Sequence, residues 1–127
     1  MHTKLTIQLV LVVLLFVTSI PFHTYGADGQ RKISQTPSTT FPITINQPGS
    51  YVLTKNLLVT DPNLNAIEIT VNDVTLDLNG HMIQGPHTGP PWGGTGKGIN
   101  AENRHSITIK NGKVWGFGSY GVYLYSA

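Results

Sequence analysis

Apolar and polar side chains alternate in short runs between Ala66 and Gly85, and turn residues separate the runs. In the first run Glu68 lies between two isoleucines, and in the second, 74–78, valine and leucine alternate with threonine and aspartate. A period of two with β-branched residues predicts strands that bury one face. Asn and Asp at 72–73 and Asn79-Gly80 tolerate the left-handed backbone of a sharp corner. The stretch therefore predicts three strands joined by two corners.

The same unit returns twice along the chain. Ala66–Ile69 corresponds to Gly98–Ala101 and to Gly121–Leu124, Val74–Asp77 to Ile107–Lys110, and Asn79-Gly80 to Asn111-Gly112. A regular repeat of strand, corner and strand is not expected of a protein built from β-hairpins. It is expected of a parallel β-helix, because each repeat is one coil stacked about 4.8 Å above the last. We therefore expect an all-β parallel solenoid.

Stacking of the repeats predicts ladders of equivalent side chains. The expected inward ladders are Ile67, Ile99 and Val122, and Ile69, Ala101 and Leu124; the expected outward columns are Glu68, Asn100 and Tyr123, and Thr70, Glu102 and Tyr125. Asn79 over Asn111 predicts a corner ladder in which the side-chain amides bond to one another.

The repeats divide the chain into segments. Residues 1–26 are a predicted signal peptide, 27–42 a flexible lead-in, 43–65 a capping coil, 66–97 and 98–120 two coils, and 121–127 part of another coil. Because the last strand has no coil above it, we expect a solenoid truncated after about three coils, the N-terminal part of a longer one. Its uncovered edge favours edge-to-edge self-association.

The first 26 residues combine Lys4, the apolar run Leu5–Ile20 and small residues at 24 and 26, which is typical of a cleaved secretory signal. The apolar run is short for a membrane anchor. We therefore expect a secreted or periplasmic protein that has no membrane association after cleavage. It contains no cysteine, and its net charge of +2 gives no reason to expect a nucleic-acid partner.

A Pro- and Gly-rich segment, 86–97, interrupts the repeat and predicts a loop that walls the outward face of the 98–102 strand stack. This position makes that face the candidate substrate-binding site, with Glu68, Trp92, Asn100, Glu102 and Tyr123 as its residues. The two glutamates could bind a cation or act as acid and base on a sugar, and the aromatic rings could stack on sugars. The alternatives are solvated outward carboxylates, a loop anchor for Trp92, and packing against another coil for Tyr123. The histidines show no paired metal-ligand spacing.

Three segments of the sequence resemble the right-handed parallel β-helix proteins of the pectin-lyase-like superfamily. They are Gly49–Leu57, Asn72–His81 and Ile107–Val114. The resemblance implies a right-handed β-helix that binds acidic polysaccharide or acts on it as a lyase, epimerase or hydrolase. Ca²⁺ is the expected cofactor only in the lyase form, and no other cofactor is evident. The family's Asn-Thr-Asp, Asp-Asp, His-Gly and Asp-Pro-His-Asp elements are absent, so catalytic residues stay unknown. The alternative is a non-catalytic surface or carbohydrate-binding solenoid.

Overall fold

The computed structural model describes residues 29–126, and the predicted signal peptide lies outside them. This part of the chain is all β. Its strands are β1 (Arg31–Ile33), β2 (Ile43–Ile45), β3 (Gly49–Leu53), β4 (Leu57–Leu58), β5 (Ile67–Ile69), β6 (Val74–Asp77), β7 (Met82–Gln84), β8 (Lys97–Glu102), β9 (Ile107–Lys110), β10 (Lys113–Trp115) and β11 (Tyr120–Tyr125). Within residues 29–126 there is no helix with the length and apolar character needed to cross a membrane.

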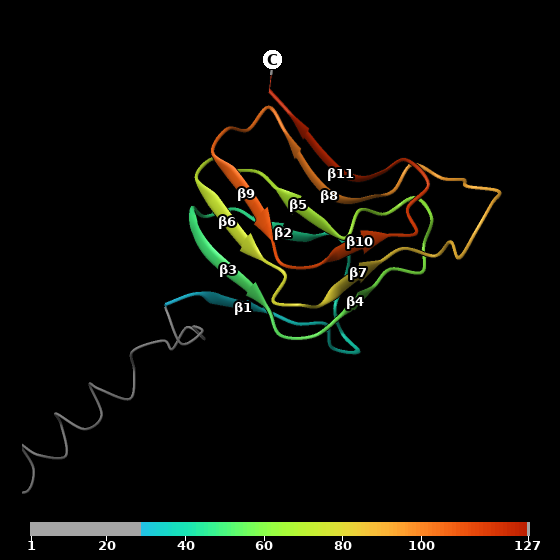
Figure 1. Cartoon of the computed structure of the whole chain (residues 1–127), viewed down its shortest axis with the longest axis horizontal. Helices are drawn as coiled ribbons and strands as arrows, with labels where there is room; N and C mark the ends of the chain where they lie inside the picture. Colours follow the sequence, from blue (N-terminus) through green and yellow to red (C-terminus); the bar gives the residue numbers. More distant parts are fainter. Residues whose placement is uncertain (1–28, 127) are drawn as a thin grey trace, which may run out of the picture.

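The strands form three sheets in which every pairing is parallel (Figure 1). Sheet A has the order β1-β3-β6-β9, sheet B the order β2-β5-β8-β11, and sheet C the order β4-β7-β10. The chain visits sheets B, A and C in turn, so β2–β4, β5–β7 and β8–β10 are successive coils and β11 starts another. This arrangement is that of a parallel β-solenoid, as the repeats predicted.

The register of the sheets confirms the predicted pairing of the repeats. In sheet B, Ile67 pairs with Ile99, which pairs with Val122, and Ala101 pairs with Leu124. In sheet A, the four residues of β6 pair one to one with those of β9. The alternation of apolar and polar residues therefore fixes which side chains share a ladder, because a slip of one residue would turn every side chain to the other face.

The predicted corners have the backbone that their residue types favour. Asp73, Asn79 and Asn111 all have positive φ, at 61°, 52° and 62°. The expected amide-to-amide ladder is wrong, however. Asn79 Nδ2 donates to Leu53 O (3.3 Å), whereas Asn111 Nδ2 donates to the Asp77 carboxylate (3.2 Å). Each corner amide satisfies a different acceptor on the coil below, because the backbone carbonyl of Leu53 and the Asp77 carboxylate lie within its reach.

Residues 31–35 pair with sheets A and C at the N-terminal end of the stack, in place of the flexible lead-in expected for 27–42, and β2 is the edge of sheet B there. Strand β1 pairs with β3 and buries Ile33 in the core. Gln35 then pairs with the edge of β4: its Nε2 donates to Leu58 O (3.1 Å), and Leu58 N donates to its Oε1 (2.7 Å). One side-chain amide thus supplies the donor and the acceptor that a further strand would supply. No apolar period marks this segment because a short strand and a side chain form the closure.

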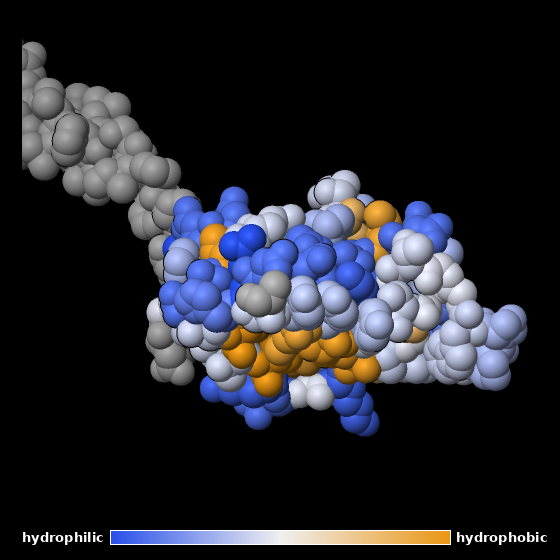
Figure 2. Space-filling model, turned by 90° about the horizontal axis from the view of Figure 1, so that it is seen from above, coloured by the Kyte–Doolittle hydropathy of each residue, from blue (hydrophilic) through white to orange (hydrophobic). Residues whose placement is uncertain are grey.

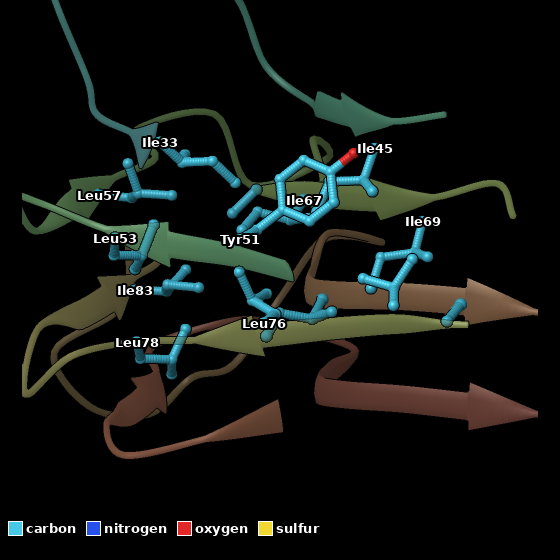
Figure 3. Packing of buried hydrophobic residues seen from close by; sticks show 14 of the residues in the cluster. Ile33, Ile45, Tyr51, Leu53, Leu57, Ile67, Ile69, Leu76, Leu78 and Ile83 are labelled. Carbon is cyan, nitrogen blue, oxygen red and sulfur yellow. The ribbon is translucent and has the colours of Figure 1, made fainter. Parts of the chain in front are cut away.

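The core is a column of mainly aliphatic side chains between the three sheets, with the rings of Tyr51 and Phe117 also buried in it (Figure 3). At its middle, Ile67, Leu76 and Ile83 come from one strand of each sheet of the second coil and are fully buried. The C-terminal end of the column differs. Ile99 and Ala101 are 0% exposed, but the residues paired with them in β11, Val122 and Leu124, are 41% and 52% exposed. Figure 2, which views the molecule from the side of β9 and β11, shows an apolar band between hydrophilic rims.

The segment between β7 and β8 forms a loop, as predicted. Thr95 N donates to Asn63 Oδ1 (3.2 Å) and Gly96 N donates to Pro62 O (3.0 Å), so the loop is tied to the turn before β5. The prediction that it walls the outward face of sheet B is wrong. Figure 1 shows the loop projecting sideways beyond the starts of β8 and β11. Its end is bonded to the turn of the coil below, which directs the loop out at the corner between sheets C and B.

Candidate functional site

The outward face of sheet B brings together three of the predicted site residues. Glu68 of β5 pairs with Asn100 of β8, which pairs with Tyr123 of β11. Their side chains form one column on the outward side, because the residues on either side of each belong to the inward ladders. The predicted column is therefore confirmed. Asn100 is only 6% exposed, so its neighbours cover an outward position that the sequence pattern would leave in water.

A closed circuit of hydrogen bonds covers Asn100. The Glu68 carboxylate accepts from Asn100 Nδ2 (2.7 Å) with one oxygen and from Asn65 Nδ2 (2.9 Å) with the other. Asn65 Oδ1 accepts from the backbone N–H of Lys97 (2.8 Å), and the Lys97 Nζ donates to Asn100 Oδ1 (3.2 Å). We call Asn65, Glu68, Lys97 and Asn100 the polar circuit. Each amide in it uses both its donor and its acceptor, so the side chains hold one another in fixed orientations.

The polar circuit continues into a row of tyrosines on β11. Lys97 Nζ lies 4.2 Å from the centroid of the Tyr123 ring, within the range of a cation–π contact. The Tyr123 ring packs in turn against Tyr120, at 4.9 Å between centroids, and against Tyr125, at 6.2 Å. Tyr120, Tyr123 and Tyr125 form what we call the tyrosine row. Tyr123 is half-buried in its middle, whereas Tyr120 and Tyr125 are each about half exposed.

Sequence reasoning missed Tyr120 and Lys97 as site residues. Strict alternation from Val122 would turn Tyr120 inward, but its ring contacts Tyr123 on the outward side. Lys97 pairs with Tyr120 in the register and behaves in the same way, reaching Asn100 three residues later. Each is followed by a glycine, Gly98 or Gly121, which is the second residue of its strand. A glycine inside a strand often marks a local irregularity, and this is the signal that could have found the two residues.

The other two predicted residues lie outside the polar circuit. Glu102 is exposed and pairs with Tyr125 in the β8–β11 register, at the far end of the tyrosine row. Trp92 lies in the projecting loop, where its ring makes an edge contact with His87 at 5.9 Å between centroids. His87 Nε2 also lies 2.6 Å from Gly93 O, so it holds both sides of the loop around Trp92. The Trp92 ring is 53% exposed, so it is not a buried loop anchor.

The titratable groups of the described residues give no sign of a metal centre at this face. No cluster of three or more His, Asp or Glu side chains occurs between residues 29 and 126 in an arrangement that could hold a metal ion. A shifted pKa occurs elsewhere, at the corner between sheets A and C. The backbone N–H of Asn79, which donates to Asp77 Oδ1 (2.8 Å), lowers the pKa of that carboxyl, and Asn111 and Lys110 add to the effect.

The site can therefore offer flat aromatic surface, a positioned ammonium group and a fixed set of amide and carboxylate groups along one face of the stack.

Comparison of the chain with protein-family models, curated proteins and solved structures finds no match.

Proposed function

We propose that the chain is a carbohydrate-binding β-solenoid that holds a polysaccharide against the outward face of sheet B. The observation that carries the proposal is the tyrosine row beside the polar circuit. Tyr120 and Tyr125 present large, rigid and partly apolar surfaces, which suit the apolar faces of sugar rings. The adjacent amides and charges offer partners for sugar hydroxyl groups. The strands of the solenoid are also fixed relative to one another, so the surface is preorganised.

Acidic polysaccharide is the class that we propose first. Lys97 is the cation of the polar circuit, and an ammonium group with three donors can bind a uronate carboxylate while it keeps its bond to Asn100. Its contact with Tyr123 places this charge next to the aromatic surface. A polymer of uronic acids would therefore bring a carboxylate and a ring face to adjacent groups on the protein.

Binding is better supported than catalysis by the contacts of Glu68. Both of its carboxylate oxygens accept hydrogen bonds from side-chain amides, so the polar circuit holds this group in place. A catalytic acid or base must instead reach a proton of the bound substrate. Glu102, the other candidate, lies opposite Tyr125 and not in the Glu68 column. A lyase or epimerase form, with Ca²⁺, would need residues beyond those that this face brings together.

We also propose that the solenoid is right-handed, belongs to the pectin-lyase-like superfamily and is exported. Right-handed connections between parallel strands of one sheet are the rule, which supports the handedness. Three parallel sheets, three strands in each coil and asparagines at the corners support the superfamily. The apolar run that ends at Ile20 supports export to the periplasm or the medium.

The experiment is a binding series on uronic-acid and neutral polysaccharides, read by affinity electrophoresis and calorimetry. We expect Tyr120→Ala and Tyr125→Ala each to weaken binding about tenfold, equal to about 1.4 kcal/mol. Lys97→Met should weaken binding to uronic-acid polymers only. Trp115→Ala is the matched control, since Trp115 is an exposed aromatic residue on sheet C.

Three results would overturn the proposal. They are no binding to any of the polymers, an equal loss from Trp115→Ala, and release of unsaturated uronate products, detected by their absorbance. The last result would make the protein a lyase.

A further inference from the structure

The tyrosine row, which runs along β11, has opposite charges beside its two ends. Lys97 pairs with Tyr120 at the start of the strand, and Glu102 pairs with Tyr125 at its other end. With about 3.3 Å between successive residues of a strand, these two ends lie roughly 17 Å apart. A uronate chain bound along the row would meet an ammonium group at the first end and an exposed carboxylate at the second. Because like charges repel, a chain longer than the row is favoured to continue past Tyr120.

The projecting loop lies against the turn that leads into Tyr120. A side chain on Gly118 would collide with Gly93 O, so the two backbones are in direct contact. Trp92 directly precedes Gly93, and Tyr120 is two residues after Gly118. Since consecutive Cα atoms are about 3.8 Å apart, the Cα atoms of Trp92 and Tyr120 are no more than roughly 17 Å apart. Trp92 is therefore the next aromatic residue at the end of the row that carries the cation.

The loop holds Trp92 in a fixed and accessible position. Ser119 N donates to Gly96 O (3.2 Å), which ties the end of the loop to the turn before β11. Across the loop, His87 Nε2 lies 2.6 Å from Gly93 O, and it donates this bond because a carbonyl can only accept. The His87 ring makes an edge contact with the Trp92 ring, which is 53% exposed. The tryptophan thus presents a supported aromatic surface to the solvent.

We propose that Trp92 is a further sugar-binding subsite and that the bound polysaccharide runs along β11, from the tyrosine row to the projecting loop. This inference rests on the proposed function and adds the path of the polymer. A path along the axis of the stack, over Glu68 and Asn100, offers less. Asn100 is 6% exposed, and its amide is bonded to Glu68 and Lys97. The exposed aromatic surface follows the strand instead. His87 is a positioning residue, since it acts through Trp92.

Calorimetry of the purified full chain with oligouronates of two lengths tests this path. A trimer fits on the tyrosine row, whereas a dodecamer extends past it. Trp92→Ala should weaken binding of the dodecamer about tenfold and leave the affinity for the trimer unchanged, because only the longer chain reaches the loop. Thr88→Ala is the matched control: it changes an exposed residue of the same loop that has no ring, and both affinities should stay as they are. Circular dichroism shows whether each variant remains folded.

The role of His87 is tested in the same assay. His87→Ala should weaken dodecamer binding in the same way, and the double variant with Trp92→Ala should lose no more than Trp92→Ala alone. His87→Gln should retain more of the affinity than His87→Ala, because its amide can still donate to Gly93 O. Additive losses in the double variant would contradict the positioning role.

The charge at the other end of the row gives an independent readout. Glu102→Gln should strengthen the binding of both oligouronates and leave the affinity for neutral oligomers unchanged, because it removes the carboxylate beside Tyr125.

Three outcomes separate this inference from the proposed function. Dodecamer binding that Trp92→Ala leaves unchanged would overturn the path, and so would an equal loss of trimer and dodecamer affinity. In both cases the tyrosine row would still be a polysaccharide site. No binding of either oligomer to the unmodified chain, or to a neutral polymer, would overturn the path and the proposed function together.

Discussion

The side-chain amide of Asn100 donates a 2.7 Å hydrogen bond to the carboxylate of Glu68, on the coil below it. Asn100 is only 6% exposed, so this bond is shielded from water although both residues belong to the outward face of sheet B. A buried amide that loses its partner costs more than an exposed one. The hydrogen bond between Asn100 and Glu68 therefore contributes both to the stability of the solenoid and to the shape of the candidate site.

Replacing Asn100 by aspartate should destabilise the fold by at least about 1–3 kcal/mol, because the donor to Glu68 is lost and two carboxylates then face each other. Thermal and urea unfolding measure the loss. Asn56→Asp is the matched control, since Asn56 is exposed and its Oδ1 only accepts from Met82 N, which an aspartate can also do. Equal stability of the two variants would contradict the polar circuit.

Ile69 provides a test of strand parity. It is 1% exposed in the core, and Ile69→Asp would bury an unpaired carboxylate, at a cost of several kcal/mol. We expect this variant not to fold, as judged by circular dichroism. Thr108→Asp, an outward change on β9, should alter stability by no more than about 0.5 kcal/mol. The inward assignment of Ile69 fails if both variants melt like the unmodified chain.

The pH dependence of stability should contain a contribution from Asp77. The pKa of its carboxyl is lowered in the folded protein, first by the hydrogen bond from Asn79 N, so the unfolded chain takes up the proton more readily. The contribution is thus present above the unfolded pKa of about 4 and is lost as the pH falls through the lower folded value. Melting temperatures measured from about pH 6 downward should fall less steeply for Asp77→Asn than for the unmodified chain. Parallel curves would show that Asp77 makes no such contribution.

Gln35→Ala should lower the free energy of unfolding by about 1–2 kcal/mol, because the backbone of Leu58 loses a donor and an acceptor at the edge of β4. The free energy of unfolding of Gln35→Glu should lie between that of Gln35→Ala and that of the unmodified chain, since its carboxylate still accepts from Leu58 N. Chemical unfolding is the measurement, and Gln47→Ala, at an exposed position in the turn before β3, is the control. No difference between Gln35→Ala and Gln47→Ala would argue against closure by Gln35.

Export remains a prediction, because residues 1–26 lie outside the described part of the chain. The small residues at 24 and 26 predict cleavage before Ala27. Amino-terminal sequencing of protein recovered from the periplasm or medium should begin at Ala27. Recovery of the chain in the membrane fraction with Met1 in place would contradict the prediction.

The sequence predicts the coils well because their signal is periodic and repeated. Ile67, Ile99 and Val122 each occupy the same place in a strand, and stacking converts this sequence register directly into spatial register. The outward column of Glu68, Asn100 and Tyr123 follows from the same parity. These features need no knowledge of individual contacts, only the period of two and the corner residues.

The features that sequence reasoning missed depend on single contacts. Gln35 closes an edge with one side chain, and no pattern distinguishes it from other polar residues of the lead-in. Tyr120 joins the tyrosine row because the strand begins irregularly beside Gly121. The loop that carries Trp92 projects sideways from the stack because its end is bonded to Pro62 and Asn63 in the preceding turn. Hydrogen bonds between neighbouring coils decide all three, and alternation along one strand does not reveal them.

The closure by Gln35 also gives the assembly of this solenoid a direction in time. The residues that pair with the N-terminal edges of sheets A and C precede every coil in the chain, so a polypeptide that emerges amino terminus first can complete these pairings before its last coil is made. Each later coil then pairs with a completed coil one repeat earlier in the chain. The entropic cost of closing a loop of one repeat is small. Growth thus proceeds from the amino-terminal coil toward β11, and each coil is laid down on the one that was made before it.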